Sequence, residues 1–173
     1  MDIRQLKSFI RDIPDFPQPG ILFRDITPLL QDPAAFRYTI SQLVERYKVD
    51  DLDVIVAVES RGFLFGAPLA YELGKPIVLV RKPGKLPYRT HTEEYSLEYG
   101  NNTMEIHVDG ILPGQKALIL DDLLATGGTL AASSRLVEKT GGLVSGIGVV
   151  IELTELEGRK ILDGYDVFSI LQY

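Results

Sequence analysis

Residues 117–129 read Ala-Leu-Ile-Leu-Asp-Asp-Leu-Leu-Ala-Thr-Gly-Gly-Thr, and this stretch decides the fold. It begins with a short aliphatic run, Ala117 to Leu120, of the kind that a β-strand buried on both faces shows. Asp121 and Asp122 follow, where that strand would emerge at its carboxyl end. After the glycine turn a helical pattern runs from Leu130 to Thr140. This order of strand, acidic pair, glycine turn and helix is typical of a phosphate-binding site.

The glycine turn, Thr126-Gly127-Gly128-Thr129, supplies the chemistry of that site. The first N–H groups of a helix have no partner within the helix, and paired glycines let a phosphate approach them without a Cβ in the way. The two aspartates would repel a phosphate, so they suit sugar hydroxyls, as hydrogen-bond acceptors, or a metal held by water. A lone Thr-Gly-Gly-Thr is more often a simple turn with a threonine cap. The strand and acidic pair before it favour the functional interpretation.

Length, charge and composition exclude several classes of protein. The 173 residues fit one domain, 1–173, with a full hydrophobic core. Lys plus Arg number 18 against 24 Asp plus Glu, and the net charge of −6 argues against nucleic acid as a partner. Cysteine is absent, which excludes disulfides and thiolate metal sites. The sequence has neither a signal-peptide pattern nor an apolar run of about 18 residues, so we expect a cytoplasmic protein that does not span a membrane.

Alternating strand and helix patterns predict an α/β fold with a mainly parallel central sheet and helices on both of its faces. The strand-like runs are 53–58, 76–80, 117–120, 143–151 and 166–173, and the helical patterns are 3–10, 33–47, 63–73 and 130–140. In such sheets ligands bind beyond the carboxyl ends of the strands. Polar segments 59–62, 81–85 and 121–129 all follow such ends, so they should converge on one cleft.

Two segments lack the regular pattern. The prolines and glycine of residues 14–20 predict an extended, irregular chain, and residues 21–25 after them are not expected to form a regular strand. Residues 81–108 begin with a basic loop and continue with alternating apolar residues on both sides of Gly100, which predicts a β-hairpin. Because this loop would lie at the edge of a phosphate cleft, we expect the loop and hairpin to act as a movable lid.

Several motifs together resemble one family. They are Pro14-Asp15-Phe16-Pro17 with Gly20, Phe23-Arg24-Asp25-Ile26, Ser60-Arg61-Gly62-Phe63, Arg81-Lys82 with Gly84-Lys85-Leu86-Pro87, Tyr95-Ser96-Leu97-Glu98-Tyr99-Gly100, the 121–129 signature and Glu152-Leu153-Thr154. From the first helix to the last strand, the chain resembles the adenine phosphoribosyltransferases among the type I phosphoribosyltransferases. The resemblance implies their fold, in which a β-hairpin hood covers the sheet and residues 1–30 form the side that receives the base.

The resemblance also implies an activity. Members of that family transfer the phosphoribosyl group of 5-phosphoribosyl-1-pyrophosphate (PRPP) to N9 of adenine, giving AMP and pyrophosphate in purine salvage with Mg²⁺. No His/Asp/Glu cluster has metal-ligand spacing, so Mg²⁺ should arrive bound to PRPP and water rather than to a protein-only site. A homodimer is implied as well. Two alternatives remain: another purine phosphoribosyltransferase, against which Phe23-Arg24-Asp25 argues, and a non-catalytic regulator that senses PRPP, against which Lys85 and Glu98 argue.

Carried over by position, the family's site residues fall into four groups. Ala125, Thr126, Gly127, Gly128 and Thr129 would hold the 5-phosphate, and Asp121 and Asp122 the ribose hydroxyls. Glu59, Ser60 and Arg61 would form the pyrophosphate loop, where the family often has a cis peptide that does not precede proline. Lys85 would close over the reaction, and Glu98 would donate or accept a proton of the purine. Leu22, Phe23, Arg24 and Leu153 would bracket the base.

The base-side residues imply how adenine would be recognised. The side chains of Leu22, Phe23 and Leu153 are apolar and cannot distinguish hydrogen-bond donors from acceptors. Discrimination would therefore come from the backbone, and the family suggests the carbonyl of Leu22 facing N6 and the N–H of Arg24 facing N1.

Overall fold

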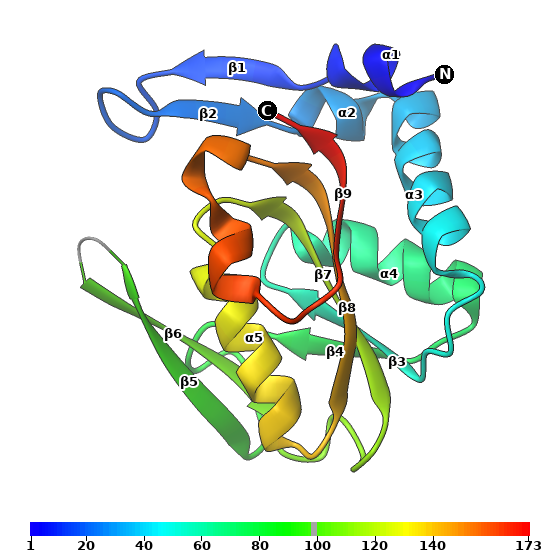
Figure 1. Ribbon diagram of the computed structural model, residues 1–173, viewed down its shortest axis with the longest axis vertical. Helices are drawn as coiled ribbons and strands as arrows, with labels where there is room; N and C mark the ends of the chain where they lie inside the picture. Colours follow the sequence, from blue (N-terminus) through cyan, green and yellow to red (C-terminus); the bar gives the residue numbers. More distant parts are fainter. Residues whose placement is uncertain (98–99) are drawn as a thin grey trace.

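A computed structural model describes residues 1–97 and 100–173 of the chain (Figure 1). In chain order the elements are α1 (Ile3–Lys7), β1 (Arg11–Pro14), β2 (Leu22–Asp25), α2 (Thr27–Gln31), α3 (Pro33–Tyr47), β3 (Val54–Val58), α4 (Gly62–Leu73), β4 (Ile77–Val80), β5 (Thr90–Leu97), β6 (Gly100–His107), β7 (Lys116–Leu124), α5 (Gly128–Lys139), β8 (Leu143–Glu152), the 3-10 helices η1 (Thr154–Leu156) and η2 (Gly158–Leu162), and β9 (Val167–Gln172). None of the helices in the described ranges is long and apolar enough to cross a membrane.

Five parallel strands form the central sheet, in the order β4-β3-β7-β8-β9. The strand that carries the acidic pair, β7, is the middle one. Each predicted strand-like run contributes one of these strands, and the prediction of a parallel α/β sheet is confirmed. Because all five strands point the same way, the segments that follow them emerge at one edge of the sheet.

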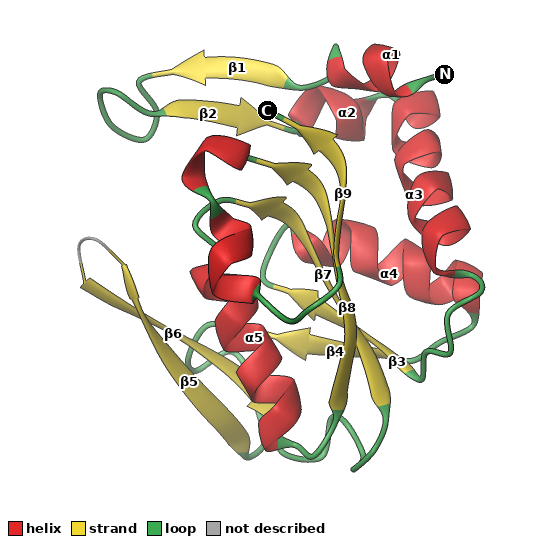
Figure 2. Cartoon of the chain, viewed as in Figure 1, coloured by secondary structure: helices red, strands yellow, loops and turns green. Residues whose placement is uncertain are grey.

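Helices cover both faces of this sheet, as predicted. Along β7, Leu118 and Leu120 face a core formed with α1 to α4, whereas Ala117 and Ile119 face a second core formed with α5 and the hairpin. Figure 2 shows the same division, with α3 and α4 on one side of the sheet and α5 on the other. Alternate side chains of a strand point to opposite faces, so a strand that is buried on both faces has a continuous run of apolar residues.

The acidic pair lies within β7 and not beyond its end, which corrects the expected strand boundary. The strand continues from Leu120 through Leu124 because its partner β8 continues with it, pairing Asp121 with Val149 and Leu124 with Glu152. Asp121 and Asp122 are consequently only 8% and 4% exposed. The pattern of apolar residues stops at Leu120 and could not indicate this extension.

The expectation of an irregular segment at residues 21–25 is wrong. β2 pairs with β1 in an antiparallel ladder from Arg11 opposite Asp25 to Pro14 opposite Leu22. Proline is tolerated on an edge strand, and Pro14 lies on β1, an edge of this two-stranded sheet, while Pro17 and Pro19 lie in the connecting loop. This small sheet lies at one end of the molecule, next to the end of β9 (Figure 1).

The predicted β-hairpin is confirmed, and it is longer than expected. β5 begins at Thr90, so the irregular loop between β4 and the hairpin covers only residues 81–89. The hairpin packs on α5 through Glu93. The Glu93 carboxylate forms ion pairs with Arg135, whose Nε lies at 2.6 Å, and with Lys139, whose Nζ lies at 2.5 Å. Its first strand is therefore attached to the helix that follows the glycine turn.

Candidate active site

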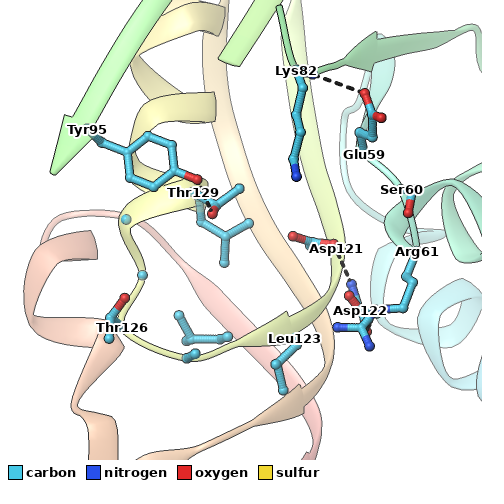
Figure 3. Close-up of a pocket in the computed structure, with 15 residues that line it drawn as sticks. Glu59, Ser60, Arg61, Lys82, Tyr95, Asp121, Asp122, Leu123, Thr126 and Thr129 are labelled. Carbon is cyan, nitrogen blue, oxygen red and sulfur yellow. Dashed lines mark hydrogen bonds and ion pairs between the residues drawn. The ribbon is translucent and has the colours of Figure 1, made fainter. Parts of the chain in front are cut away.

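A cavity of about 360 Å³ opens where the segments after β3, β4 and β7 meet (Figure 3). This convergence of polar segments was predicted from the parallel sheet. The residues that line the cavity are Glu59, Ser60, Arg61, Lys82, Tyr95, Asp121, Asp122, Leu123, Leu124, Ala125, Thr126, Gly127, Gly128, Thr129 and Leu130.

The glycine turn exposes the N-terminus of α5 to this cavity. Gly127 has a φ of +87°, a left-handed conformation that favours glycine, and α5 begins at the next residue. A Cβ on Gly127 would lie 2.5 Å from the carbonyl oxygen of Gly158, so the turn is also packed tightly from behind by η2. No side chain in the described part of the chain caps the first turn of α5. Its N–H groups remain open to an anion in the cavity.

The two aspartates differ in their surroundings. Burial, together with the adjacent charge of Asp122, raises the pKa of Asp121 well above its ordinary value. Burial also raises the pKa of Asp122, although the guanidinium of Arg61 opposes this, with Nε 2.9 Å from Asp122 Oδ2. Two carboxylates this close repel each other when both are ionised. Ligand groups that donate hydrogen bonds or carry positive charge would relieve that repulsion.

The loop after β3 contains a cis peptide bond between Glu59 and Ser60. This is the bond that the family resemblance implied. Oε2 of Glu59 accepts hydrogen bonds from Arg81 Nε and from the backbone N–H of Lys82, both at 3.0 Å. Burial would raise the pKa of Glu59, but these hydrogen bonds and the nearby cations lower it below its usual value. Glu59 thus joins the ends of β3 and β4.

Comparison with known proteins agrees with this geometry. Residues 28–172 match the family model for the phosphoribosyl transferase domain. Over 168 residues the chain is 59% identical to the adenine phosphoribosyltransferase of Kosmotoga olearia, a match that covers 97% of this chain and 99% of that protein. The chain belongs to the adenine phosphoribosyltransferase family.

Solved structures of adenine phosphoribosyltransferases have the same fold. The crystal structure of the enzyme from Thermoanaerobacter pseudethanolicus superposes with a TM-score of 0.97 at 55% identity, over 99% of both chains. The enzyme from Saccharomyces cerevisiae, crystallised with an imino-altritol bisphosphate and adenine, gives a TM-score of 0.92 at 40% identity over 98% of both chains. The fold predicted from the resemblance is therefore confirmed.

All ten residues implied for the phosphate, ribose and pyrophosphate line the cavity, whereas Lys85, expected to close over the reaction, does not. Lys82 does, and its side chain points into the cavity toward Asp121 (Figure 3). The carbonyl of Lys85 instead accepts a hydrogen bond from Arg81 Nη1 at 3.3 Å. Lys82 lies within the polar segment 81–85 that was expected at the cleft, but nothing in the sequence distinguished it from Lys85.

Four further lining residues were given no role in the site from the sequence, although Tyr95 belongs to one of the family motifs. Leu123, Leu124 and Leu130 flank the acidic pair and the glycine turn, so they belong to segments already identified. Tyr95 comes from the hairpin, and its hydroxyl lies 2.8 Å from Thr129 Oγ1. The alternating pattern indicated a hairpin, but nothing in the sequence indicates which of its faces meets the glycine turn.

The residues expected to bracket adenine do not line the cavity. The ring of Phe23 lies 5.3 Å from the guanidinium carbon of Arg61, and the N–H of Leu153 donates to the carbonyl of Leu124 at 2.9 Å, so both are next to lining residues. The side chain of Arg24 forms an ion pair with Asp12. Leu22 is largely exposed. Glu98, the expected proton donor or acceptor, lies outside the described residues.

Proposed function

We propose that this chain transfers the phosphoribosyl group of PRPP to N9 of adenine, giving AMP and pyrophosphate for purine salvage. The bond between C1 of the ribose and the pyrophosphate oxygen breaks, and its electron pair leaves with pyrophosphate. A bond forms between C1 and N9, and N9 loses its proton. The observation that carries the proposal is one cavity that joins a buried aspartate pair, an open helix N-terminus and two cationic side chains, Arg61 and Lys82.

In this proposal the 5-phosphate binds at the turn formed by residues 125–129. The open N–H groups at the start of α5 would donate to its oxygens, and the positive end of the helix dipole favours its charge. Thr126 and Thr129 would add hydroxyl donors. Gly128 lacks a Cβ, and the ring of Tyr95 packs where that Cβ would lie.

Asp121 and Asp122 would accept hydrogen bonds from the ribose 2- and 3-hydroxyls. Both carboxylates line the same cavity as the glycine turn. The backbone N–H of Asp122 donates to Asp121 Oδ1 at 2.8 Å, which fixes the first carboxylate relative to the strand. The ribose hydroxyls would donate hydrogen bonds to the two carboxylates, so binding the ribose would stabilise both negative charges.

Ser60, Arg61 and Lys82 would bind the pyrophosphate, with Glu59 positioning the backbone of Lys82. Negative charge grows on pyrophosphate as its bond to C1 breaks, and cations fixed beside it stabilise that charge more in the transition state than in the ground state. Lys85 would approach from the 81–89 loop and complete the closure over the reacting groups.

Mg²⁺ would be bound largely by the phosphate oxygens of PRPP and by water. The donor set fits such an arrangement, because the Asp121 and Asp122 carboxylates line the cavity and oxygen ligands suit Mg²⁺. When bound, the ion would neutralise charge on pyrophosphate.

Adenine would be recognised by backbone groups on the edge of β2 that does not pair with β1. Pro14, which lies opposite Leu22, has no N–H to donate to the Leu22 carbonyl. Along an antiparallel strand the polar groups of residues two apart point to the same side, so the carbonyl of Leu22 and the N–H of Arg24 share one side. Phe23 and Leu153 would enclose the ring of the base. Glu98 would donate a proton to the purine or accept one from it.

We propose that this chain shares the remaining features of its family. The chain would act as one domain, 1–173, in which residues 1–30 serve the base and residues 81–108 close over the site. It would work in the cytoplasm as a homodimer. Leu64 and Tyr71, seven residues apart on one face of α4, are 44% and 85% exposed and offer an apolar surface to a second copy.

A direct assay tests the reaction. The purified protein, supplied with adenine, PRPP and Mg²⁺, should form AMP and pyrophosphate, and the omission of any one reactant should stop product formation. Conversion of hypoxanthine or guanine but not adenine would instead support another purine phosphoribosyltransferase. PRPP binding without turnover of any purine would support the regulator.

A further inference from the structure

The hairpin contacts the glycine turn through Tyr95, a residue that has no role in the proposed reaction. The hydroxyl of Tyr95 lies 2.8 Å from Thr129 Oγ1, and both residues line the cavity (Figure 3). The ring of Tyr95 also packs on Gly128, since a Cβ placed on that glycine would lie 2.9 Å from Tyr95 Cδ2. A hairpin residue thus contacts two consecutive residues of the turn where the 5-phosphate is proposed to bind.

The position of Tyr95 is fixed by its neighbours on β5. Glu93 and Tyr95 are two residues apart on one strand, so their side chains point to the same face. Glu93 is held against α5 by Arg135 and Lys139, and Lys139 Nζ also donates to the carbonyl of Thr92 at 2.7 Å. These contacts attach the strand to the same helix whose first turn carries Thr129. The Tyr95 hydroxyl therefore meets Thr129 in a defined geometry.

The chemistry of a phosphate decides the direction of this hydrogen bond. A phosphate dianion offers only acceptor oxygens, so the single proton of the Thr129 hydroxyl must point to the phosphate to bind it. The Tyr95 hydroxyl must then donate its own proton to Thr129 Oγ1. A hydroxyl that accepts one hydrogen bond becomes a stronger donor of the next, and a donor to an anion forms the stronger class of hydrogen bond.

We propose that Tyr95 is a positioning residue for the 5-phosphate, which acts by donating to Thr129 Oγ1 and directing the Thr129 proton to the phosphate. This inference rests on the proposed function only in that a 5-phosphate occupies the turn. It assigns to the hairpin a part in binding PRPP that is separate from covering the reaction. Tyr95 itself need not touch the phosphate.

The Tyr95→Phe variant tests the role of the hydroxyl, because it keeps the ring on Gly128. We expect KM for PRPP to rise about 3- to 10-fold, the effect of one lost hydrogen bond, with kcat and KM for adenine within about twofold of the parent values. A purely structural role would lower the melting temperature or the active fraction and would leave KM for PRPP unchanged. Tyr165→Phe is the matched control, since Tyr165 donates to Glu138, near the opposite end of α5, at 2.8 Å.

A double-mutant cycle tests the route through Thr129. Thr129→Val should weaken PRPP binding, Thr129→Ser should restore most of it, and Tyr95→Phe should have no further effect when combined with Thr129→Val. If Tyr95→Phe weakens PRPP binding equally in the parent and in the Thr129→Val variant, the proposal is overturned.

Calorimetric titration with ribose 5-phosphate separates this inference from the proposed reaction, because the probe needs no turnover. Tyr95→Phe should raise Kd for ribose 5-phosphate about 3- to 10-fold, whether or not the parent protein forms AMP. An unchanged Kd in a folded variant, or no binding of ribose 5-phosphate by the parent, would overturn the positioning role. Absence of AMP formation with ribose 5-phosphate binding intact would contradict only the reaction.

Discussion

Arg159 binds both carboxylate oxygens of Glu152, with Nε donating to Oε1 at 2.6 Å and Nη2 donating to Oε2 at 2.8 Å. Ser169 Oγ donates to Oε2 as well, at 2.6 Å, and Glu152 is only 4% exposed. The pair joins the end of β8 to η2. Gly158 of η2 packs against the glycine turn, since a Cβ placed on Gly158 would lie 2.2 Å from the carbonyl oxygen of Ala125. The ion pair between the buried Glu152 and the partly exposed Arg159 thus supports the glycine turn from behind.

Glu152 should make the stability of the fold depend on pH. The hydrogen bond from Arg159 is the largest cause of a lowered pKa at Glu152. Together with the other hydrogen bonds it outweighs the effect of burial and lowers the pKa of Glu152 to about 2. A carboxylate with a depressed pKa in the folded state stabilises the protein above its unfolded pKa, near 4.5, and this contribution is lost as the pH falls toward 2. The contribution at pH 7 is about 2 to 3 kcal/mol, and about 2 kcal/mol of it should be lost by pH 3.

Urea unfolding of the parent and of Glu152→Gln at pH 7 and pH 3 measures this contribution. The difference in unfolding free energy between the two proteins should shrink markedly at pH 3. Glu45→Gln is the control, because Glu45 pairs with Lys48 on the exposed surface of α3 and should matter little at either pH. An equal difference at both pH values would contradict the assignment of the pH dependence to Glu152.

The aspartate pair should be needed for activity and not for folding. Burial and mutual repulsion raise the pKa of Asp121, so its charge costs stability at neutral pH. The double variant Asp121→Asn with Asp122→Asn should therefore fold at least as stably as the parent, and kcat/KM for PRPP should fall by about 100-fold or more. Melting temperature and steady-state kinetics measure the two effects. Full activity in a stable double variant would remove the proposed role in binding the ribose.

The loop of residues 81–89 should become ordered over the site when PRPP binds. It carries Lys82 and Lys85 and has no regular structure apart from the bridge between Arg81 and Glu105. We expect its amides to gain protection from hydrogen exchange with saturating PRPP and Mg²⁺. Lys82→Ala and Lys85→Ala should lower turnover more than stability, and Lys48→Ala, at the end of α3, should leave turnover unchanged. Unchanged exchange in residues 81–89 would contradict a lid.

The sequence predicts the sheet and the glycine turn before α5 because their signals are local. The runs at Val54–Val58 and Ala117–Leu120 are apolar on both faces, and paired glycines before a helix start favour an anion site whatever surrounds them. The extension of β7 through Asp121 and Asp122 had no such signal, since pairing with β8 overrides the polarity of the two carboxylates.

Contacts between distant segments explain the rest of what the sequence did not predict. The β1–β2 ladder forms across a proline-containing loop, and pairing of this kind leaves no periodic pattern in either short strand. The contacts of Tyr95 with Thr129 and of Glu152 with Arg159 depend on which faces of packed elements meet. Lys82 and Lys85 are the same residue type, and only the path of the chain after β4 distinguishes them.

Adenine is the base in the proposed reaction, and the backbone groups of β2 predict how strongly it is preferred over hypoxanthine. Adenine offers a donor at N6 and an acceptor at N1, which match the Leu22 carbonyl and the Arg24 N–H. Hypoxanthine offers an acceptor at O6 and a donor at N1, so both contacts are reversed, and each mispaired buried group costs about 1 to 3 kcal/mol. Measurement of kcat/KM for both bases should therefore give a ratio of about 30 to 10⁴ in favour of adenine. A ratio near one would contradict the account.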